Sequence, residues 1–224
     1  VACLGYCGLG PNAMIDGMPV SLAAHGALDA VLAYVQGGTE HGLHEPTNVV
    51  HVPQADQPVV VLRHMGHDVT DLESARKQGI YSALLKARGM EPQAVIDEIK
   101  ASQLRGRGGA GFPTGIKLQT VHDSQAPDDS GRRFIVVNFD EGDAGSYIDK
   151  ELIERDPHSQ IEGILIAAHA TGAQHAYIYA RAEYPKARQI LAAAVTQARE
   201  AGLLAPCEIS VVRGQGAYIC GEET

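Results

Sequence analysis

The stretch Ala176-Tyr177-Ile178-Tyr179-Ala180 predicts a short β-strand, because tyrosine and isoleucine favour extended backbone. Similar runs occur from Phe134 to Val137 and from Glu208 to Val212, and helical patterns separate the three runs, from about Ser159 to Thr171 and from Pro185 to Ala201. Strands and helices that alternate at this spacing predict right-handed crossovers and a parallel sheet. We therefore expect an α/β fold with a parallel, Rossmann-like sheet that helices cover on both faces.

The part of the chain before this pattern predicts mostly helices. Gly172 and Gly202 stand where helix C-caps are expected, and Pro185 suits a first helical turn. The earlier elements that we expect are a helix from Pro19 to Val35 packing on Leu22, Leu28 and Leu32, a strand from Val59 to Leu62, a helix from Asp71 to Gly89 carrying Ile80, Leu84 and Leu85, and helices from Pro92 to Ser102 and from Thr114 to Val121.

A glycine-rich stretch from Leu104 to Lys117 reads LRGRGGAGFPTGIK. Its glycines let a ligand approach the backbone closely, and two arginines and a lysine add positive charge, so we expect it to hold a phosphate-bearing cofactor. The G-x-G-x-x-G pattern from Gly106 to Gly111 is weak support for a dinucleotide site, because a helix and not a strand precedes it. No Gly-Lys-Ser/Thr phosphate loop follows at the right distance. The alternative is a flexible linker, which the arginines and the Phe-Pro pair disfavour.

Polar residues follow two of the predicted strands directly. Asn138 to Asp143 follows the first strand and Gly214 to Glu223 follows the third. Open parallel sheets bind ligands beyond the carboxyl ends of their strands, so both segments are candidates for one site. The carboxylates a little further on, Asp149, Glu151 and Glu154, are expected to be a solvated helix start.

Composition excludes several classes of protein. The 224 residues carry a formal net charge of -9, which gives no basic surface for nucleic acid. No apolar run approaches the roughly eighteen residues of a membrane span. Four cysteines at uneven spacing do not suit a secreted disulfide scaffold, so a reducing cytosolic compartment is expected. The chain begins at Val1 without a methionine and stops inside a motif at Thr224, which predicts a fragment of a longer protein.

Cys3 and Cys7 stand four positions apart in a glycine-rich turn and could ligate one iron. A cluster needs four ligands, so the pair is half a site, and two ordinary thiols are an equally good interpretation of the spacing alone. Cys207 and Cys220 each stand alone and are not expected to be ligands. The pairs His41 and His44, and His64 and His67, are expected to be solvated loop histidines rather than metal ligands.

The stretch LRGRGGAGFPTGIK closely resembles the flavin-mononucleotide (FMN) loop of the NADH-oxidising flavoprotein subunits of respiratory complex I, and of their relatives in NAD-linked hydrogenases and formate dehydrogenases. NFDEGD at 138–143 and GAYICGEET at 216–224 follow in the order of that family. The resemblance covers about Asp71 to Thr224. The first twenty residues resemble, separately, the end of a thioredoxin-like [2Fe-2S] ferredoxin domain.

This resemblance implies an NADH dehydrogenase that passes a hydride from NADH to FMN and single electrons to iron-sulfur clusters, or works in reverse. It implies iron-sulfur partner subunits in a larger redox complex. That complex would lie in the cytoplasm or on the inner face of a membrane. We expect the chain neither to bind nucleic acid nor to insert into a membrane. No catalytic acid, base or nucleophile is needed, because the protein only binds, orients and tunes the cofactors. The implied cofactor residues are Gly106, Arg107, Gly108, Phe112, Lys117, Asn138, Asp140, Glu141, Asp143, Tyr218, Gly221, Glu222 and Glu223.

The same resemblance implies two clusters and three segments. Cys3 and Cys7 would bind a [2Fe-2S] cluster with two cysteines before Val1, and the ligands of a [4Fe-4S] cluster would lie outside this stretch. The expected segments are the end of the thioredoxin-like domain at 1–36, a linker at 37–70, and an FMN- and NADH-binding domain at 71–224.

Three residues depart from the family pattern. Phe139 stands where alanine is usual, Asp143 where glutamate is usual, and Leu118 where tryptophan is usual. The shorter Asp143 side chain could weaken or reposition the contact to the nicotinamide nucleotide, and Leu118 could remodel one wall of the pocket. These departures motivate a second hypothesis, a redox-inactive nucleotide-binding or scaffolding paralogue. The acidic residues Asp143, Glu222 and Glu223 should disfavour a 2'-phosphate and so favour NADH over NADPH.

Overall fold

The computed structural model describes residues 12–16, 18–23, 25–39, 42–43, 60–64, 66–107, 110–125, 131–143, 146–217 and 219. The expectations for Cys3, Cys7, His41, His44, Gly108, Tyr218, Cys220, Gly221, Glu222 and Glu223 lie outside the described residues. Within them, no helix combines the length and the apolar character that crossing a membrane requires.

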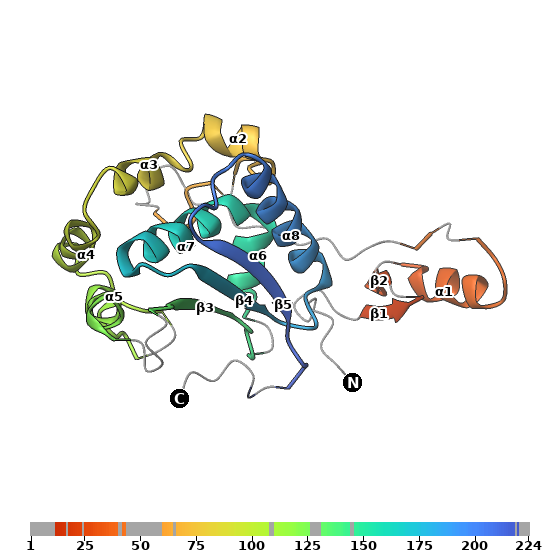
Figure 1. Cartoon of the computed structure of the whole chain (residues 1–224). Coiled ribbons are helices and arrows are strands. Elements are labelled where there is room, and N and C mark those ends of the chain that lie inside the picture. Colours follow the sequence, from red (N-terminus) through yellow and green to blue (C-terminus); the bar gives the residue numbers. More distant parts are fainter. Residues whose placement is uncertain are drawn as a thin grey trace.

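A small unit near the N-terminus contains a hairpin and a helix. Strand β1 (Asn12–Ile15) pairs antiparallel with β2 (Met18–Ser21), and α1 (Ala27–Val35) follows. Figure 1 shows this unit apart from the sheet and its helices. The predicted helix from Pro19 onward is wrong in its first half, because pairing with β1 holds the backbone extended there. The leucines at 28 and 32 that were expected to pack are half or more exposed.

Helices α2 (Leu72–Lys77), α3 (Ser82–Arg88), α4 (Pro92–Ala101) and α5 (Thr114–Asp123) precede the sheet, and the last two confirm the prediction. The single helix predicted from 71 to 89 is wrong. Gly79 and Tyr81 take positive φ values of 82° and 76°, which end one helix and turn the chain into the next. Ile80 and Leu84 are buried as expected, whereas Leu85 is exposed.

The segment before α2 also differs from the prediction. Residues 60–62 form an exposed turn and not a strand, since they pair with no other strand among the residues that the structure describes. His64 and Val69 are nevertheless buried. The expected linker is therefore buried at these two described positions, and His64 is not a solvated histidine.

The sheet contains β3 (Phe134–Phe139), β4 (His175–Ala180) and β5 (Glu208–Arg213), parallel and in that order, which confirms the predicted strands. Helix α7 (Pro157–Thr171) connects the first two strands and α8 (Pro185–Glu200) the last two. Gly172 ends α7 in a left-handed conformation with φ of 74°. Helix α6 (Ile148–Arg155) was not predicted as an element of its own.

Helices cover one face of this sheet and not both, so that part of the prediction is wrong for the described residues. Figure 1 shows α7 and α8 on the same side. On the other face Phe134, Val136 and Tyr177 are 46%, 72% and 39% exposed. The strand order explains the difference: strands that are added in one direction by right-handed crossovers place every connecting helix on the same face. Helices on both faces require a reversal of strand order.

The core lies between the covered face and the helices, where Ile161, Ile178, Leu191 and Ile209 are fully buried. A buried polar chain extends this core to α2 and α3. The Tyr81 hydroxyl lies 2.7 Å from Nδ1 of His158, whose Nε2 lies 3.2 Å from Oε1 of Gln197. Burial lowers the pKa of His158, which fits a neutral ring that accepts at Nδ1 and donates from Nε2.

Candidate cofactor site

Three strand ends meet along the carboxyl edge of the sheet, each followed by a buried residue. Phe139 pairs with Ala180, and Ala180 pairs with Arg213. The ladder continues one step further, because Arg181 N donates to Phe139 O at 2.9 Å and Gly214 N donates to Ala180 O at 2.7 Å. Asp140, Arg181 and Gly214 therefore form one row across the ends of β3, β4 and β5.

Asp140 is the hydrogen-bond acceptor of this row, at the end of the outer strand β3. It is 6% exposed, and its Oδ2 atom has no hydrogen-bond partner among the described residues. Its backbone N–H donates to Asn138 Oδ1 at 3.1 Å, which fixes the turn that brings the carboxylate in. A Cβ at position 214 would lie 2.9 Å from Asp140 Oδ2, so the glycine leaves room for the carboxylate. Burial raises the pKa of Asp140, and the charge of Arg181 partly opposes that shift.

Glu141 has a structural role that the sequence did not suggest. Its Oε1 accepts from the backbone N–H groups of Ile148 at 2.6 Å and Asp149 at 3.3 Å, and its Oε2 accepts from the Tyr184 hydroxyl at 3.2 Å. Tyr147, at the N-cap position of α6, makes no side-chain capping bond. Glu141 therefore caps α6, and a carboxylate is favoured at that end of a helix.

The carboxylates of α6 are not solvated, which corrects the expectation for Asp149, Glu151 and Glu154. Lys150 Nζ, on a side chain 3% exposed, lies 3.1 Å from Glu154 Oε1. Asp149 lines a cavity of about 90 Å³ beneath the end of β3, together with Phe139 and several aliphatic side chains. Burial, with the nearby negative charge of Glu141, raises the pKa of Asp149 to about 6.

This raised pKa makes stability depend on pH. The pKa of Asp149 is about 6 in the folded chain against an ordinary 3.8, so its favourable contribution is complete below about pH 4 and is lost as pH rises through 6. Asp149→Asn should raise the free energy of unfolding by about 1 kcal/mol at pH 8, after discounting for partial exposure and the lost helix-dipole attraction, and change it little at pH 4.

Denaturant unfolding at the two pH values measures this difference. Asp29→Asn, in the first turn of α1 and exposed, is the matched control and should show no such gain. Equal destabilisation by Asp149→Asn at both pH values would contradict the expectation.

The glycine-rich loop is closed at its base and projects outward. Gly106 N donates to Phe112 O at 2.8 Å and Thr114 N donates to Leu104 O at 2.9 Å. Arg105 Nη1 donates to Gly111 O at 3.0 Å. These bonds argue against a flexible linker at the base of the loop. The Phe112 ring is 50% exposed and offers an open aromatic face.

The last glycine of this stretch serves helix packing. A Cβ on Gly115 would lie 2.9 Å from the backbone nitrogen of Lys100, so α5 can cross α4 this closely only with glycine. Leu118, one turn later, is 9% exposed and packs with Val95 and Ile96. Leu118 is therefore a core residue of the α4–α5–α7 contact, and the expectation that it remodels a pocket wall is wrong.

The structure brings some of the expected residues together and not others. Asn138, Asp140 and Glu141 lie at the carboxyl end of β3, with Asp143 exposed beyond them. The described residues of the loop make no hydrogen bond to this group. Arg107 and Lys117 are exposed on the loop and on the first turn of α5.

Two residues at the end of β4 were missed by the sequence reasoning. Arg181 is 8% exposed, and its Nε lies 3.4 Å from Glu183 Oε2. They follow the middle strand directly. Polar residues directly after a strand were the signal that selected the segments after the first and third strands, and the same rule applied to the middle strand would have selected Arg181 and Glu183.

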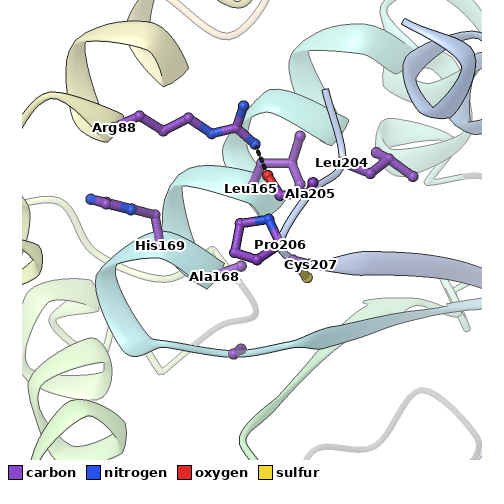
Figure 2. Close-up of a pocket in the computed structure, with 9 residues that line it drawn as sticks. Arg88, Leu165, Ala168, His169, Leu204, Ala205, Pro206 and Cys207 are labelled. Carbon is purple, nitrogen blue, oxygen red and sulfur yellow. Dashed lines mark hydrogen bonds between the residues drawn. The ribbon is translucent and has the colours of Figure 1, made fainter. Parts of the chain in front are cut away.

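A second cavity lies at the opposite end of the sheet (Figure 2). It measures about 200 Å³ and is lined by residues that include Arg88, His169 and Cys207. Arg88 Nη2 donates to Leu203 O at 2.6 Å and Ala205 O at 2.7 Å, so this side chain ties α3 to the loop before β5. Burial raises the pKa of the Cys207 thiol to about 11, which keeps it protonated.

A parallel sheet with buried, partly unpartnered polar groups at its carboxyl edge defines an α/β cofactor-binding domain. The chain belongs to the family described as the Nuo51 FMN-binding domain, whose family model matches residues 99–224. The family resemblance drawn from the sequence is thereby confirmed.

Curated relatives agree with this family. The chain is 46% identical over 164 residues to an NADH-quinone oxidoreductase subunit of Aquifex aeolicus, covering 70% of this chain and 37% of that protein. It is 39% identical over 177 residues to the mitochondrial 51 kDa subunit of NADH-ubiquinone oxidoreductase of Aspergillus niger, covering 75% and 36%. The chain thus spans well under half the length of these relatives.

A solved structure shares the fold. The NAD+-reducing [NiFe]-hydrogenase in its H2-reduced state matches with a TM-score of 0.74 and 30% identity, over 99% of this chain and 36% of the hydrogenase chain. The same enzyme in its air-oxidised state matches with a TM-score of 0.72.

Proposed function

We propose that the chain is the FMN- and NADH-binding part of a flavoprotein that oxidises NADH, or reduces NAD+, within a larger redox complex. The observation that carries this proposal is the buried Asp140 carboxylate, which has an unpartnered oxygen at the carboxyl edge of the sheet in a chain of the FMN-binding family. The names of the relatives, an NADH-quinone oxidoreductase and an NAD+-reducing hydrogenase, support both directions of electron flow.

The residues present fit FMN. An unpartnered buried carboxylate oxygen suits a hydroxyl or N–H donor, and FMN carries both on its ribityl chain and ring. The absent side chain at Gly214 leaves room for that carboxylate at the strand ends. The loop adds the positive charges of Arg107 and Lys117, which suit the phosphate.

Each expected residue receives a proposed role. When bound, FMN accepts a hydride from NADH and passes electrons singly to an iron-sulfur cluster. Gly106, Gly108, Arg107 and Lys117 hold the phosphate, and Asn138 and Asp140 bind the ribityl chain or ring edge. Glu141 supports that edge by capping α6. Stacking and placement of the nicotinamide nucleotide fall to Phe112, Asp143, Tyr218, Gly221, Glu222 and Glu223.

The iron-sulfur part of the proposal concerns residues outside the described ranges. Cys3 and Cys7 bind a [2Fe-2S] cluster with two further cysteines, at the end of a thioredoxin-like domain. A [4Fe-4S] cluster, with ligands outside this stretch, would supply the one-electron acceptor, and the partners would be iron-sulfur subunits in the cytoplasm or on the inner face of a membrane.

A redox-inactive paralogue is the weaker candidate. Two of the three departures that motivated it lie in the core: Phe139 is 3% exposed and its ring centroid lies 6.2 Å from that of Tyr184, while Leu118 packs between helices. Only Asp143 stands exposed beside the site. The favoured function is therefore the flavin-dependent NADH dehydrogenase.

Flavin reduction in the intact protein tests this function. We expect bound FMN whose visible absorbance bleaches with NADH, and at least about tenfold slower reduction by NADPH, because like charges repel the 2'-phosphate. Asp143→Asn should narrow that preference, whereas Asp97→Asn, exposed on α4, should leave it unchanged.

Two outcomes would count against the proposal. Intact protein without bound flavin would contradict the function itself. Equal or faster reduction by NADPH would contradict the electrostatic argument and leave the flavin site standing.

A further inference from the structure

A charged pair is buried at the end of β4, and the proposed function assigns no role to it. Arg181 and Glu183 have side chains only 10% and 11% exposed, and their closest charged atoms lie 3.4 Å apart. Buried charges are costly unless they are paired and hydrogen-bonded. Their presence at the ligand edge of the sheet therefore calls for a reason beyond packing.

The guanidinium of Arg181 is only partly satisfied. Its Cζ lies 5.3 Å from the centroid of the Tyr184 ring, which stacks a cation over an aromatic face. Its Nε and Nη1 atoms have no hydrogen-bond partner among the described residues. The ring of Tyr184 is in turn fixed by its hydroxyl bond to Glu141. Arg181 is thus held in place by stacking, with N–H donors left over.

The row across the strand ends places this cation beside Asp140. Backbone pairing sets Arg181 opposite Asp140, and the Asp140 carboxylate extends past the end of β4 to the space beside Gly214. We propose that Arg181 is a positioning residue that acts through Asp140: its positive charge, set beside the carboxylate by the strand register, keeps Asp140 ionised as a hydrogen-bond acceptor for FMN. This inference rests on the proposed function and deepens it.

The charges around Asp140 act in opposite directions. Burial raises the pKa of Asp140 most, Arg181 lowers it, and Glu183 raises it. The other charged groups on neighbouring elements include Glu141, which caps α6, Asp149 on α6, Arg188 on α8, and Arg213 on β5. The segment after β5 contributes the backbone of Gly214 next to the carboxylate. Arg181 is therefore the group that counteracts burial.

An ionised carboxylate can only accept hydrogen bonds, whereas a protonated one offers a donor. The ligand group that suits Asp140 is therefore an N–H or a hydroxyl, both of which FMN supplies. If Arg181 maintains the ionised state, removing it should make FMN binding fail as pH falls. Removing Glu183 should have the opposite effect, because its charge raises the pKa of Asp140.

The test is the dissociation constant of FMN as a function of pH, from neutral down to the lowest pH at which the protein stays folded, because burial raises the pKa of the Asp140 carboxyl. It is measured by flavin fluorescence quenching on intact apoprotein. In Arg181→Met the midpoint of the binding profile should move up by about one pH unit, a tenfold loss of affinity on the acid side. Arg181→Lys keeps the cation and should shift the midpoint less. Glu183→Gln should move it down.

Opposite shifts of the pH midpoint in Arg181→Met and Glu183→Gln would show that Arg181 acts through the charge of Asp140. A merely structural role would weaken FMN binding in both variants at every pH. In an Asp140→Asn background, Arg181→Met should cause no further shift, since the group that titrates is gone. Gly214→Ala keeps all charges but intrudes on the carboxylate, and should weaken binding at every pH.

Three outcomes decide the inference. Equal loss of FMN affinity in Arg181→Met at the acid and at the neutral end of the pH profile would overturn it in favour of a direct or structural role. If that variant does not fold by circular dichroism, the absence of a downward shift in Glu183→Gln would overturn it as well. Failure of the wild type to bind FMN at any pH would instead refute the proposed function.

Discussion

Alanine at position 115 is expected to lower the free energy of unfolding by about 2 kcal/mol and to weaken FMN binding at the same time. The added Cβ would lie 2.6 Å from Lys100 Cγ and 2.9 Å from the Lys100 backbone nitrogen. Backbone cannot move aside as a side chain can, so α5 must shift away from α4. Overpacking of this kind costs about 1–3 kcal/mol, and the better helix propensity of alanine offsets less than about 1 kcal/mol.

The effect should reach the cofactor because Gly115 lies in the first turn of α5, directly after the glycine-rich loop. Thr114 N anchors the base of that loop on Leu104 O. A displaced helix start therefore displaces the proposed phosphate-binding backbone.

Gly163→Ala is the matched control for this prediction. Gly163 is also inside a helix, but a Cβ there would meet nothing within 4 Å. Alanine at 163 should stabilise the protein by about 0.5–1 kcal/mol and leave FMN binding unchanged. Denaturant unfolding and flavin titration measure both effects, and a Gly115→Ala protein as stable as Gly163→Ala would show that the helices can separate without cost.

The second large effect is expected at Asp156. Its Oδ1 accepts from Ser159 N at 3.2 Å and caps α7, and its Oδ2 lies 2.7 Å from Nδ1 of the buried His64. Asp156→Ala removes the cap and the carboxylate partner of the buried imidazole, which keeps only Ser159 Oγ, 3.3 Å from His64 Nδ1. We expect a loss of about 3–4 kcal/mol, the sum of a cap and a broken buried pair.

Related variants separate the two contributions. Asp156→Asn keeps a capping oxygen and should cost about 1–2 kcal/mol less than alanine. Asp71→Ala removes the exposed cap of α2, bonded to Ser74 N at 3.0 Å, and should cost only about 1 kcal/mol.

A double-mutant cycle with His64→Ala should show coupling of at least about 1 kcal/mol, because both residues share one contact. Additive effects would mean that the pair does not hold residues 60–69 against α7.

Local sequence was sufficient for elements whose signals agree. The three parallel strands, α4, α5, α7 and α8 were predicted within a few residues, because apolar runs, Pro185 and Gly172 all indicate the same boundaries. Prediction from local sequence failed where strand pairing or a turn of the chain overrode the local pattern. Pro19 to Ser21 joins a hairpin, and the positive φ values at Gly79 and Tyr81 split one apolar pattern into two helices.

The candidate site was predictable in place and only partly in detail. Asn138 to Asp143 follows a predicted strand, so its position at a carboxyl edge followed from the sequence. That Glu141 caps α6 and that Asp140 points toward Gly214 depends on neighbours far apart in the chain. A carboxylate can either cap a helix or face a ligand, and only its contacts in the folded chain show which of the two it does.

By itself the sequence determined the α/β class, the parallel order of elements and the FMN-binding family, because periodicity and a long glycine-rich motif are local properties. Only the tertiary structure decided that helices cover one face, since this depends on the direction in which strands are added. It also brought Arg181 and Glu183 beside Asp140, because adjacency across parallel strands is set by register, which no local stretch of residues encodes.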